Sequence, residues 1–278
     1  MSKDEELPNP GLSVTFLEKI EDVTEKVLNG VKEKYSEKER NEIISKNIEK
    51  IENETVTGLF TTWVNNAPDL LAIKHGDHCI SYNELSQNAL DIAYRLQSHG
   101  IKHGDVVAIL GGRNVGFITS VLGVMLSGGV VLPVDRDLPE KRQQFMVSDT
   151  NASLLIYSGD EAERPLWLQK NIILKQVNID AQTGKCLKHE SVTINGLPQI
   201  NHEDRAYIFY TSGTTGNPKG ICGHHGGLGH FISWQSKTFD INTSDKVAFL
   251  TNISFDVVLR DIFLPLFSGA TICLQVRE

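Results

Sequence analysis

Strand-like and helix-like segments alternate between residues 105 and 158, and this alternation restricts the possible folds more than any other feature. The apolar runs "DVVAILGG", "GGVVLPV" and "SLLIYS" each predict a strand, and the segments at 115–127 and 138–150 between them predict helices. Strands that alternate with helices in this way form a parallel sheet covered on both faces. The sequence therefore predicts an α/β domain with a doubly wound, largely parallel sheet and helices on both faces.

Local signals on either side extend this pattern. An apolar stripe predicts a helix from residue 56 that ends before Pro68, and "LLAIKHGDHCISY" predicts a hairpin turning at Gly76 and Asp77. Ser81 and Glu84 form a capping box for a helix whose C-terminal glycine is Gly100. Further strands are expected in 171–180, 206–210, 246–252 and 270–276, helices in 225–238 and 257–269, and a loop over 181–203.

The N-terminal segment differs in character from the rest of the chain. Apolar residues recur there at helical spacing among many charges of both signs. We expect residues 1–55 to form amphipathic helices that act as a linker, with a dedicated partner-binding module as the alternative. Residues 56–278 then form the second part of the chain.

Composition excludes several classes of partner and compartment. The net charge of −8 argues against nucleic acid, whose phosphates require a basic surface. Four scattered cysteines show neither zinc-ligand spacing nor a disulfide framework, which suits a cytoplasmic protein. The uncharged stretch 114–134 is long enough to cross a membrane, but its Gly-Gly pair and Pro133 favour a buried helix, turn and strand. We therefore expect no membrane association.

A loop rich in glycine and hydroxyl side chains follows the strand at 206–210. It reads "YTSGTTGNPKG" and combines glycines, four serine and threonine hydroxyls and a lysine. Glycines allow the backbone to approach a ligand, and successive N–H groups can bind an anion. The loop is not a Walker A motif, because the second glycine and the magnesium-binding hydroxyl of that motif are absent. It suits polyphosphate, with an ordinary exposed turn as the alternative. The residues expected to bind phosphate are Thr211, Ser212, Gly213, Thr214, Thr215, Gly216 and Lys219.

The same loop resembles the signature motif of the adenylate-forming, AMP-binding enzymes. Three other segments resemble motifs of that family in the same order: "ISYNELSQNALDIAYRLQSHGI", "GVMLSGGVVLPVDRDLPEKR" and "NISFDVVLRDIFLPLFSGATICL". The resemblance covers 56–278 and is greatest to the amino-acid adenylation domains of nonribosomal peptide synthetases. Residues 36–60 are similar to the linker between condensation and adenylation domains.

This resemblance implies an activity and assigns residues to it. Members use ATP and Mg²⁺ to adenylate a carboxylate, which a thiol then attacks, usually that of phosphopantetheine on a carrier domain. It implies that Lys219 neutralises phosphate charge, and that Phe255 and Asp256 enter the substrate pocket. Asp256 would pair with the ammonium of an amino acid, or it could be a helix-terminal aspartate. Arg260 would line the pocket, or it could pair with Asp261 or another acid.

The resemblance also predicts what this stretch of chain lacks. Later family elements, including the ribose-binding aspartate and the catalytic lysine of the C-terminal domain, have no counterpart in these 278 residues. We expect a truncated N-terminal part of an adenylation domain, inactive alone and dependent on the missing C-terminal part. A fragment of an acyl-CoA-synthetase-like ligase and a non-enzymatic remnant are the alternatives. The paired His224 and His225 are expected to support the structure rather than bind metal.

Overall fold

The computed structural model describes residues 55–170, 174–188, 196–211 and 218–275 of the chain. These residues all belong to one compact unit, Ile44–Glu278. The predicted linker at 1–55 lies outside the described residues except for Thr55. Residues 212–217, which make up most of the predicted phosphate loop, also lie outside them.

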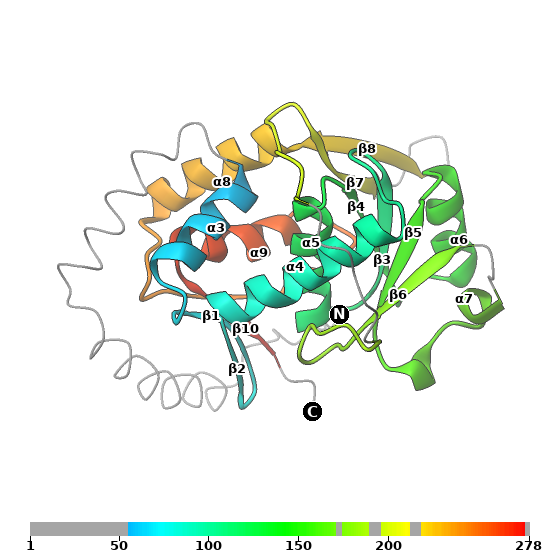
Figure 1. The fold of residues 1–278 in the computed structure, drawn as a ribbon, viewed down its shortest axis with the longest axis horizontal. Helices are drawn as coiled ribbons and strands as arrows, with labels where there is room; N and C mark the ends of the chain where they lie inside the picture. The colour runs from blue at the N-terminus through cyan, green and yellow to red at the C-terminus, as the bar shows by residue number, and fades with distance from the viewer. Residues whose placement is uncertain (1–54, 171–173, 189–195, 212–217, 276–278) are drawn as a thin grey trace, which may run out of the picture. The chain divides into compact units, whose positions relative to one another are not determined.

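A six-stranded sheet organises the larger part of this unit, and its strand order is β6-β5-β3-β4-β7-β8 (Figure 1). Neighbouring strands run parallel except for β7 and β8, which form an antiparallel hairpin. The predicted alternation is confirmed: three buried strands that follow one another in the chain are parallel, and one helix connects each strand to the next. The strands are β3 (Val106–Gly111), β4 (Val130–Asp135), β5 (Leu154–Ser158), β6 (Lys175–Ile179), β7 (Arg205–Thr211) and β8 (Lys219–His224).

Helices cover both faces of this sheet, as Figure 1 shows. On one side, α6 (Glu140–Asp149) and α7 (Leu166–Lys170) pack against alternate residues of β3, β4 and β5. On the other side lie α4 (Tyr82–Ser98) and α5 (Val115–Leu126). A short 3₁₀ helix, η2 (Glu161–Glu163), precedes α7.

The uncharged stretch 114–134 is a buried helix, turn and strand, as predicted. Every residue of α5 from Val115 to Met125 is buried. Gly123 allows α4 to approach closely, because a Cβ there would lie 2.6 Å from Cγ2 of Ile92. None of the helices in the described part of the chain is both long and apolar enough to cross a bilayer.

A second, four-stranded sheet was not distinguished by the sequence pattern. Its order is β2-β1-β10-β9, and it joins the predicted hairpin to strands about 170 to 200 residues later in the chain. Only the β1–β2 pair is antiparallel. The strands are β1 (Leu71–His75), β2 (His78–Ser81), β9 (Lys246–Ala248) and β10 (Thr271–Leu274).

Long-range hydrogen bonds connect the early helices to the end of the described chain. In α3 (Val56–Asn66), the indole of Trp63 donates to the carbonyl of Phe267 at 2.7 Å. The buried hydroxyl of Tyr82 donates to the carbonyl of Ala270 at 2.8 Å. Both acceptors lie at the junction of α9 (Val258–Ser268) and β10, so these bonds hold α9 in place.

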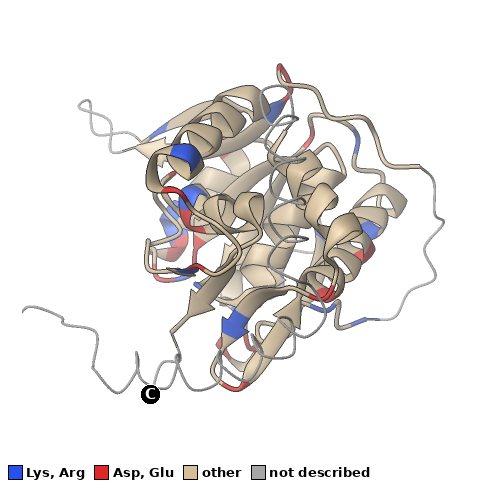
Figure 2. Ribbon diagram, turned by 90° about the vertical axis from the view of Figure 1, so that its left-hand side faces the viewer, with Lys and Arg blue, Asp and Glu red and all other residues tan. Residues whose placement is uncertain are grey.

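Charged residues of both signs are interspersed over the described ribbon, as Figure 2 shows. In this view neither sign covers a continuous face of the described part. The remaining helix, α8 (His225–Phe239), follows β8 directly and runs beside α9 (Figure 1).

Candidate functional site

The β7–β8 hairpin carries the described part of the predicted phosphate loop. Thr211 ends β7, Lys219 begins β8, and the two residues are partners in the antiparallel register. Both are exposed. The structure therefore places Thr211 and Lys219 opposite one another at the end of the hairpin that carries the loop. The strand β8 was missed by the sequence analysis, because its glycines and partial exposure produce no clear alternation.

Side chains of β7 make contacts on both faces of the sheet. On one face, the hydroxyl of Tyr210 donates to a carboxylate oxygen of Asp149 at 2.5 Å, and its ring contacts Phe145 edge-on. Burial, together with Asp149, raises the pKa of Tyr210, so this hydroxyl keeps its proton. On the other face, the rings of Tyr207 and Phe209 meet at 5.6 Å between centroids.

The predicted substrate pair lies just before α9. Phe255 is 63% exposed, and Asp256 is exposed two residues before the first residue of the helix. Burial raises the pKa of Tyr207, and the charge of Asp256 raises it further, so the two groups lie within electrostatic range of each other. The strand β7 thus relates to both parts of the candidate site: its end carries the phosphate loop, and its Tyr207 senses the charge of Asp256.

Arg260, the third predicted substrate residue, pairs with its neighbour. Its Nη2 lies 2.9 Å from Oδ1 of Asp261, and its Nε lies 3.2 Å from the same oxygen. The Asp261 side chain is 4% exposed, whereas that of Arg260 is 39% exposed. This contact is one of the two roles that the sequence left open for Arg260.

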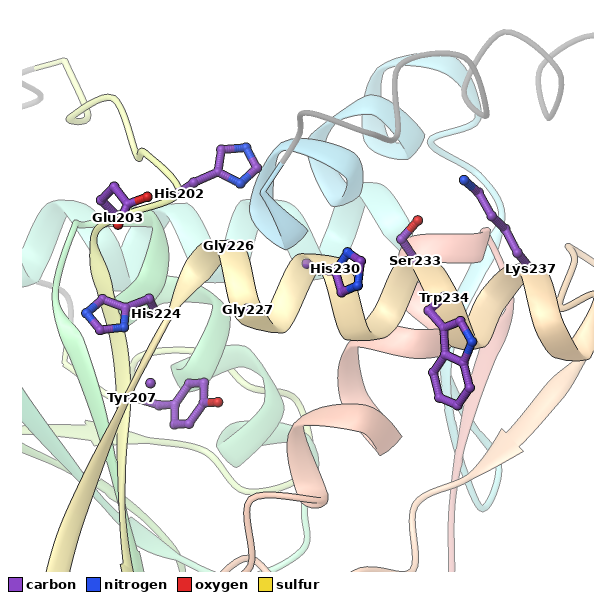
Figure 3. A pocket seen from close by; sticks show the side chains of 12 residues that line it. His202, Glu203, Tyr207, His224, Gly226, Gly227, His230, Ser233, Trp234 and Lys237 are labelled. Atoms are coloured by element: carbon purple, nitrogen blue, oxygen red, sulfur yellow. The ribbon is translucent and has the colours of Figure 1, made fainter.

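An open pocket of about 990 Å³ adjoins Tyr207 along α8. Figure 3 shows its labelled side chains, which come from α8, from the end of β8, from β7 and from the segment before β7. Gly223 is required there, because a Cβ at this position would lie 2.1 Å from Cζ of Tyr207. The sequence analysis did not predict this pocket. Its polar lining comprises His202, Glu203, Tyr207, His224, His230, Ser233 and Lys237.

His225 lies in the interior behind this pocket. It is 1% exposed, and its Nδ1 lacks a hydrogen-bond partner among the described residues. Burial lowers the pKa of His225 from 6.5 to about 4. The carboxylate of Asp204 opposes this shift, and the neighbouring His103, His202 and His224 reinforce it. Within the described ranges, no three histidine, cysteine or acidic side chains are grouped to hold a metal ion.

The buried His225 makes stability depend on pH. Between pH 6.5 and about 4, the unfolded chain binds a proton that folded His225 does not, so stability decreases as the pH falls. We expect a loss of about 2–3 kcal/mol in the free energy of unfolding between pH 7 and pH 4.5, measured by urea denaturation. The depressed pKa of Asp204 contributes only below this range.

Two variants separate this effect from other titrations. His225→Gln removes the buried imidazole, and we expect it to flatten the pH dependence between pH 7 and pH 4.5. His230→Gln removes an exposed imidazole from the same helix and should leave the dependence unchanged. An equal pH dependence in His225→Gln and the wild-type chain would show that other groups cause it.

Comparison with known proteins assigns this arrangement to a family. The AMP-binding enzyme family matches residues 60–278, which is most of the chain. The chain therefore belongs to the AMP-binding enzyme family. A second family, Peptidase S46, matches residues 1–63, nearly all of which lie outside the described residues. That shorter match supports no assignment for the chain.

The similar curated proteins are large peptide synthases. Tyrocidine synthase 3 of Brevibacillus parabrevis is 29% identical over 232 residues, which cover 81% of this chain and 3% of the relative. Bacitracin synthase 1 of Bacillus licheniformis is 32% identical over 254 residues, which cover 90% of this chain and 5% of the relative. The chain thus spans less than a tenth of the length of these relatives.

Solved structures share the fold. A variant of the nonribosomal peptide synthetase FmoA3 matches with a TM-score of 0.67 and 21% identity, over 86% of this chain and 25% of that one. The N-terminal subdomain of Klebsiella oxytoca NpsA, in complex with 3-hydroxybenzoyl-AMSN, matches with a TM-score of 0.67 and 24% identity. That match covers 81% of this chain and 55% of that one. The predicted fold, the N-terminal part of an adenylate-forming domain, is confirmed.

Proposed function

We propose that this chain takes part in ATP-dependent activation of an amino acid. The carboxylate of the amino acid attacks the α-phosphate of ATP, which forms an aminoacyl-adenylate and releases pyrophosphate. A phosphopantetheine thiol on a carrier partner then attacks the carbonyl of the adenylate, which forms a thioester and releases AMP. The observation that carries this proposal is the family match over residues 60–278, which includes both the phosphate loop and Asp256.

The charge of the reactants explains the need for Lys219. A carboxylate that approaches a polyphosphate meets repulsion of roughly 4 kcal/mol per unit-charge pair at about 4 Å and an effective dielectric of 20. An ammonium placed beside the phosphates offsets this repulsion and stabilises the departing pyrophosphate. The exposed Thr211 hydroxyl and Lys219 ammonium, paired across one hairpin, are a donor set that fits phosphate oxygens.

Mg²⁺ would be held mainly by the phosphates of ATP, because in this donor set the Thr211 hydroxyl can ligate a cation whereas the Lys219 ammonium cannot. Mg²⁺ in nucleotide sites is commonly bound by one or two carboxylates together with the phosphates, so it requires no cluster of acidic side chains. It would supply further positive charge at the phosphates. Within the described residues, the contribution we assign to the protein is that of Thr211 and Lys219.

Asp256 favours an amino acid over an acid without an amine. Its carboxylate is exposed and lies near Tyr207, so it is available to pair with a substrate ammonium. A fatty acid offers no cation for this carboxylate and would bring its own negative charge towards it. We therefore favour amino acid activation over an acyl-CoA-synthetase-like activity.

Pyrophosphate exchange into ATP tests this proposal. The full-length natural protein is incubated with labelled pyrophosphate, ATP and Mg²⁺, with each proteinogenic amino acid in turn or with aliphatic and aromatic acids of similar size. We expect exchange that depends on one or a few amino acids. If exchange occurred with the acids that lack an amine but with none of the amino acids, the role of Asp256 would be refuted and the acyl alternative favoured.

A further inference from the structure

The segment Leu250–Asp256, between β9 and α9, carries the predicted substrate pair and is held by several side chains. We propose that Asp261 is the positioning residue of this segment, and that Arg260 is the charge partner of Asp261 and does not select the substrate side chain. This inference rests on the proposed function for its substrate. The contacts by which Asp261 positions the segment do not depend on the proposed function.

Asp261 is the main anchor. Its Oδ2 accepts hydrogen bonds from the backbone N–H groups of Thr251 at 2.9 Å and Leu250 at 3.3 Å. A buried carboxylate requires such donors, because an uncompensated buried charge is strongly unfavourable. The contact joins the first turn of α9 to the backbone that follows β9. It therefore fixes the start of the loop that leads to Asp256.

Arg260 completes the environment of this carboxylate. Its guanidinium donates twice to Oδ1 of Asp261, the oxygen that does not contact the backbone amides. Each carboxylate oxygen thus has its own two donors. In this arrangement the charge of Arg260 is directed to a buried acid of the protein, so Arg260 acts on the substrate through Asp261 and the loop.

Two further contacts attach the same segment to the six-stranded sheet. Arg113, which follows β3, donates a hydrogen bond to the carbonyl of Leu250. The hydroxyl of Ser254 lies 3.4 Å from Oδ2 of Asp135, a buried residue at the end of β4. The segment is therefore held at both its beginning and its end, with Phe255 and Asp256 immediately after Ser254. This placement keeps Asp256 near Tyr207.

Hydrogen exchange tests the structural part of the inference. In Asp261→Asn, the charge is lost and one oxygen is replaced by an amide group that donates. We expect the amides of Leu250 and Thr251 to exchange at least tenfold faster, while amides of β3 exchange at their wild-type rate. The matched control is Asp245→Asn at the opposite end of β9, where the carboxylate accepts from the amide of Asn242 at 2.8 Å. It should leave Leu250 and Thr251 unaffected.

Unchanged exchange at Leu250 and Thr251 in Asp261→Asn would overturn the anchoring role. Faster exchange throughout the chain would also overturn it, because the effect would then be a general loss of stability. The chain of residues 1–278 suffices for this measurement, which requires no catalytic activity.

The kinetics of pyrophosphate exchange into ATP, measured on the full-length protein, test the functional part of the inference. We expect Asp261→Asn to raise the KM for the amino acid at least tenfold and to change the KM for ATP less than twofold. Arg260→Gln should raise the KM of every accepted amino acid by a similar factor and leave their ranking unchanged. A changed ranking would show that Arg260 contacts the substrate side chain and would overturn its assigned role.

The two proposals fail in different ways. If the wild-type protein shows no pyrophosphate exchange with any amino acid, the proposed function is wrong, and the substrate part of this inference is wrong with it. The hydrogen-exchange result for Leu250 and Thr251 then still decides whether Asp261 anchors the segment. If the wild-type protein is active and Asp261→Asn raises both KM values equally, only the positioning inference is overturned.

Discussion

Replacing Asp256 with alanine is expected to raise the amino acid KM of the full-length protein at least a hundredfold, with little change in the KM for ATP. In the proposed complex, the substrate ammonium is buried against the Asp256 carboxylate. Removing one partner of a buried ion pair leaves an uncompensated charge and costs about 3–5 kcal/mol. Amino-acid-dependent pyrophosphate exchange at varied amino acid concentration measures the effect.

Because Asp256 is exposed in the free protein, the change in KM shows whether its carboxylate becomes buried when the substrate binds. If the carboxylate remains exposed when substrate binds, the pair contributes only about 0–1 kcal/mol and KM changes less than about fivefold. Such a result would contradict Asp256 as the ammonium partner. Asp77→Ala is the matched control, because it removes the same charge from the exposed β1–β2 turn, at the opposite edge of the four-stranded sheet from β9. It should leave the KM for the amino acid unchanged.

Replacing Lys219 with alanine is expected to lower kcat of the adenylation step about 10²–10³-fold, while the amino acid KM changes less than about threefold. The loss corresponds to roughly 3–4 kcal/mol of stabilisation for the charge that develops on the phosphates. Lys219 begins β8 and lies opposite Thr211, so this exposed lysine stands at the end of the hairpin that carries the loop. Single-turnover formation of the adenylate measures this step directly.

Two comparisons support the interpretation of that result. Lys219→Arg keeps the positive charge and should recover part of the rate. Lys141→Ala removes an exposed lysine from α6 and should have no effect. If Lys219→Ala instead raised the amino acid KM and left kcat intact, Lys219 would bind the substrate carboxylate and not the phosphates.

The sequence predicted the elements that depend on local patterns. The buried strands β3, β4 and β5 are continuous apolar runs, and such runs mark strands covered on both faces. The cap of α4 was also predictable, since the Ser81 side chain accepts from the amide of Glu84. Gly100 has the positive φ of 88° expected after a helix. Each of these features depends on residues that are near neighbours in the chain.

The candidate site was only partly predictable. The motif residues Thr211 and Lys219 were identified from the composition of the loop, but their pairing across a hairpin required β8, which the pattern did not show. The resemblance to the family identified Asp256 as a candidate residue, but it did not predict that Asp256 lies within electrostatic range of Tyr207. Residues 212–217 and the linker at 1–55 remain predictions.

The sequence by itself determined the α/β class and the order of most helices and strands, because hydrophobic period, caps and glycine chemistry act over a few residues; it also predicts that the loop binds phosphate. Only the tertiary structure decided that the strands divide between two sheets, that Arg260 pairs with Asp261, and that Asp261 holds the backbone before Asp256. The two sheets and the contacts of Asp261 with Leu250 and Thr251 join segments about 10 to 200 residues apart, and the choice of Arg260 between its two possible roles depends on where packing buries Asp261. Their free energy comes from burial and from hydrogen bonds that form only after the segments have packed together.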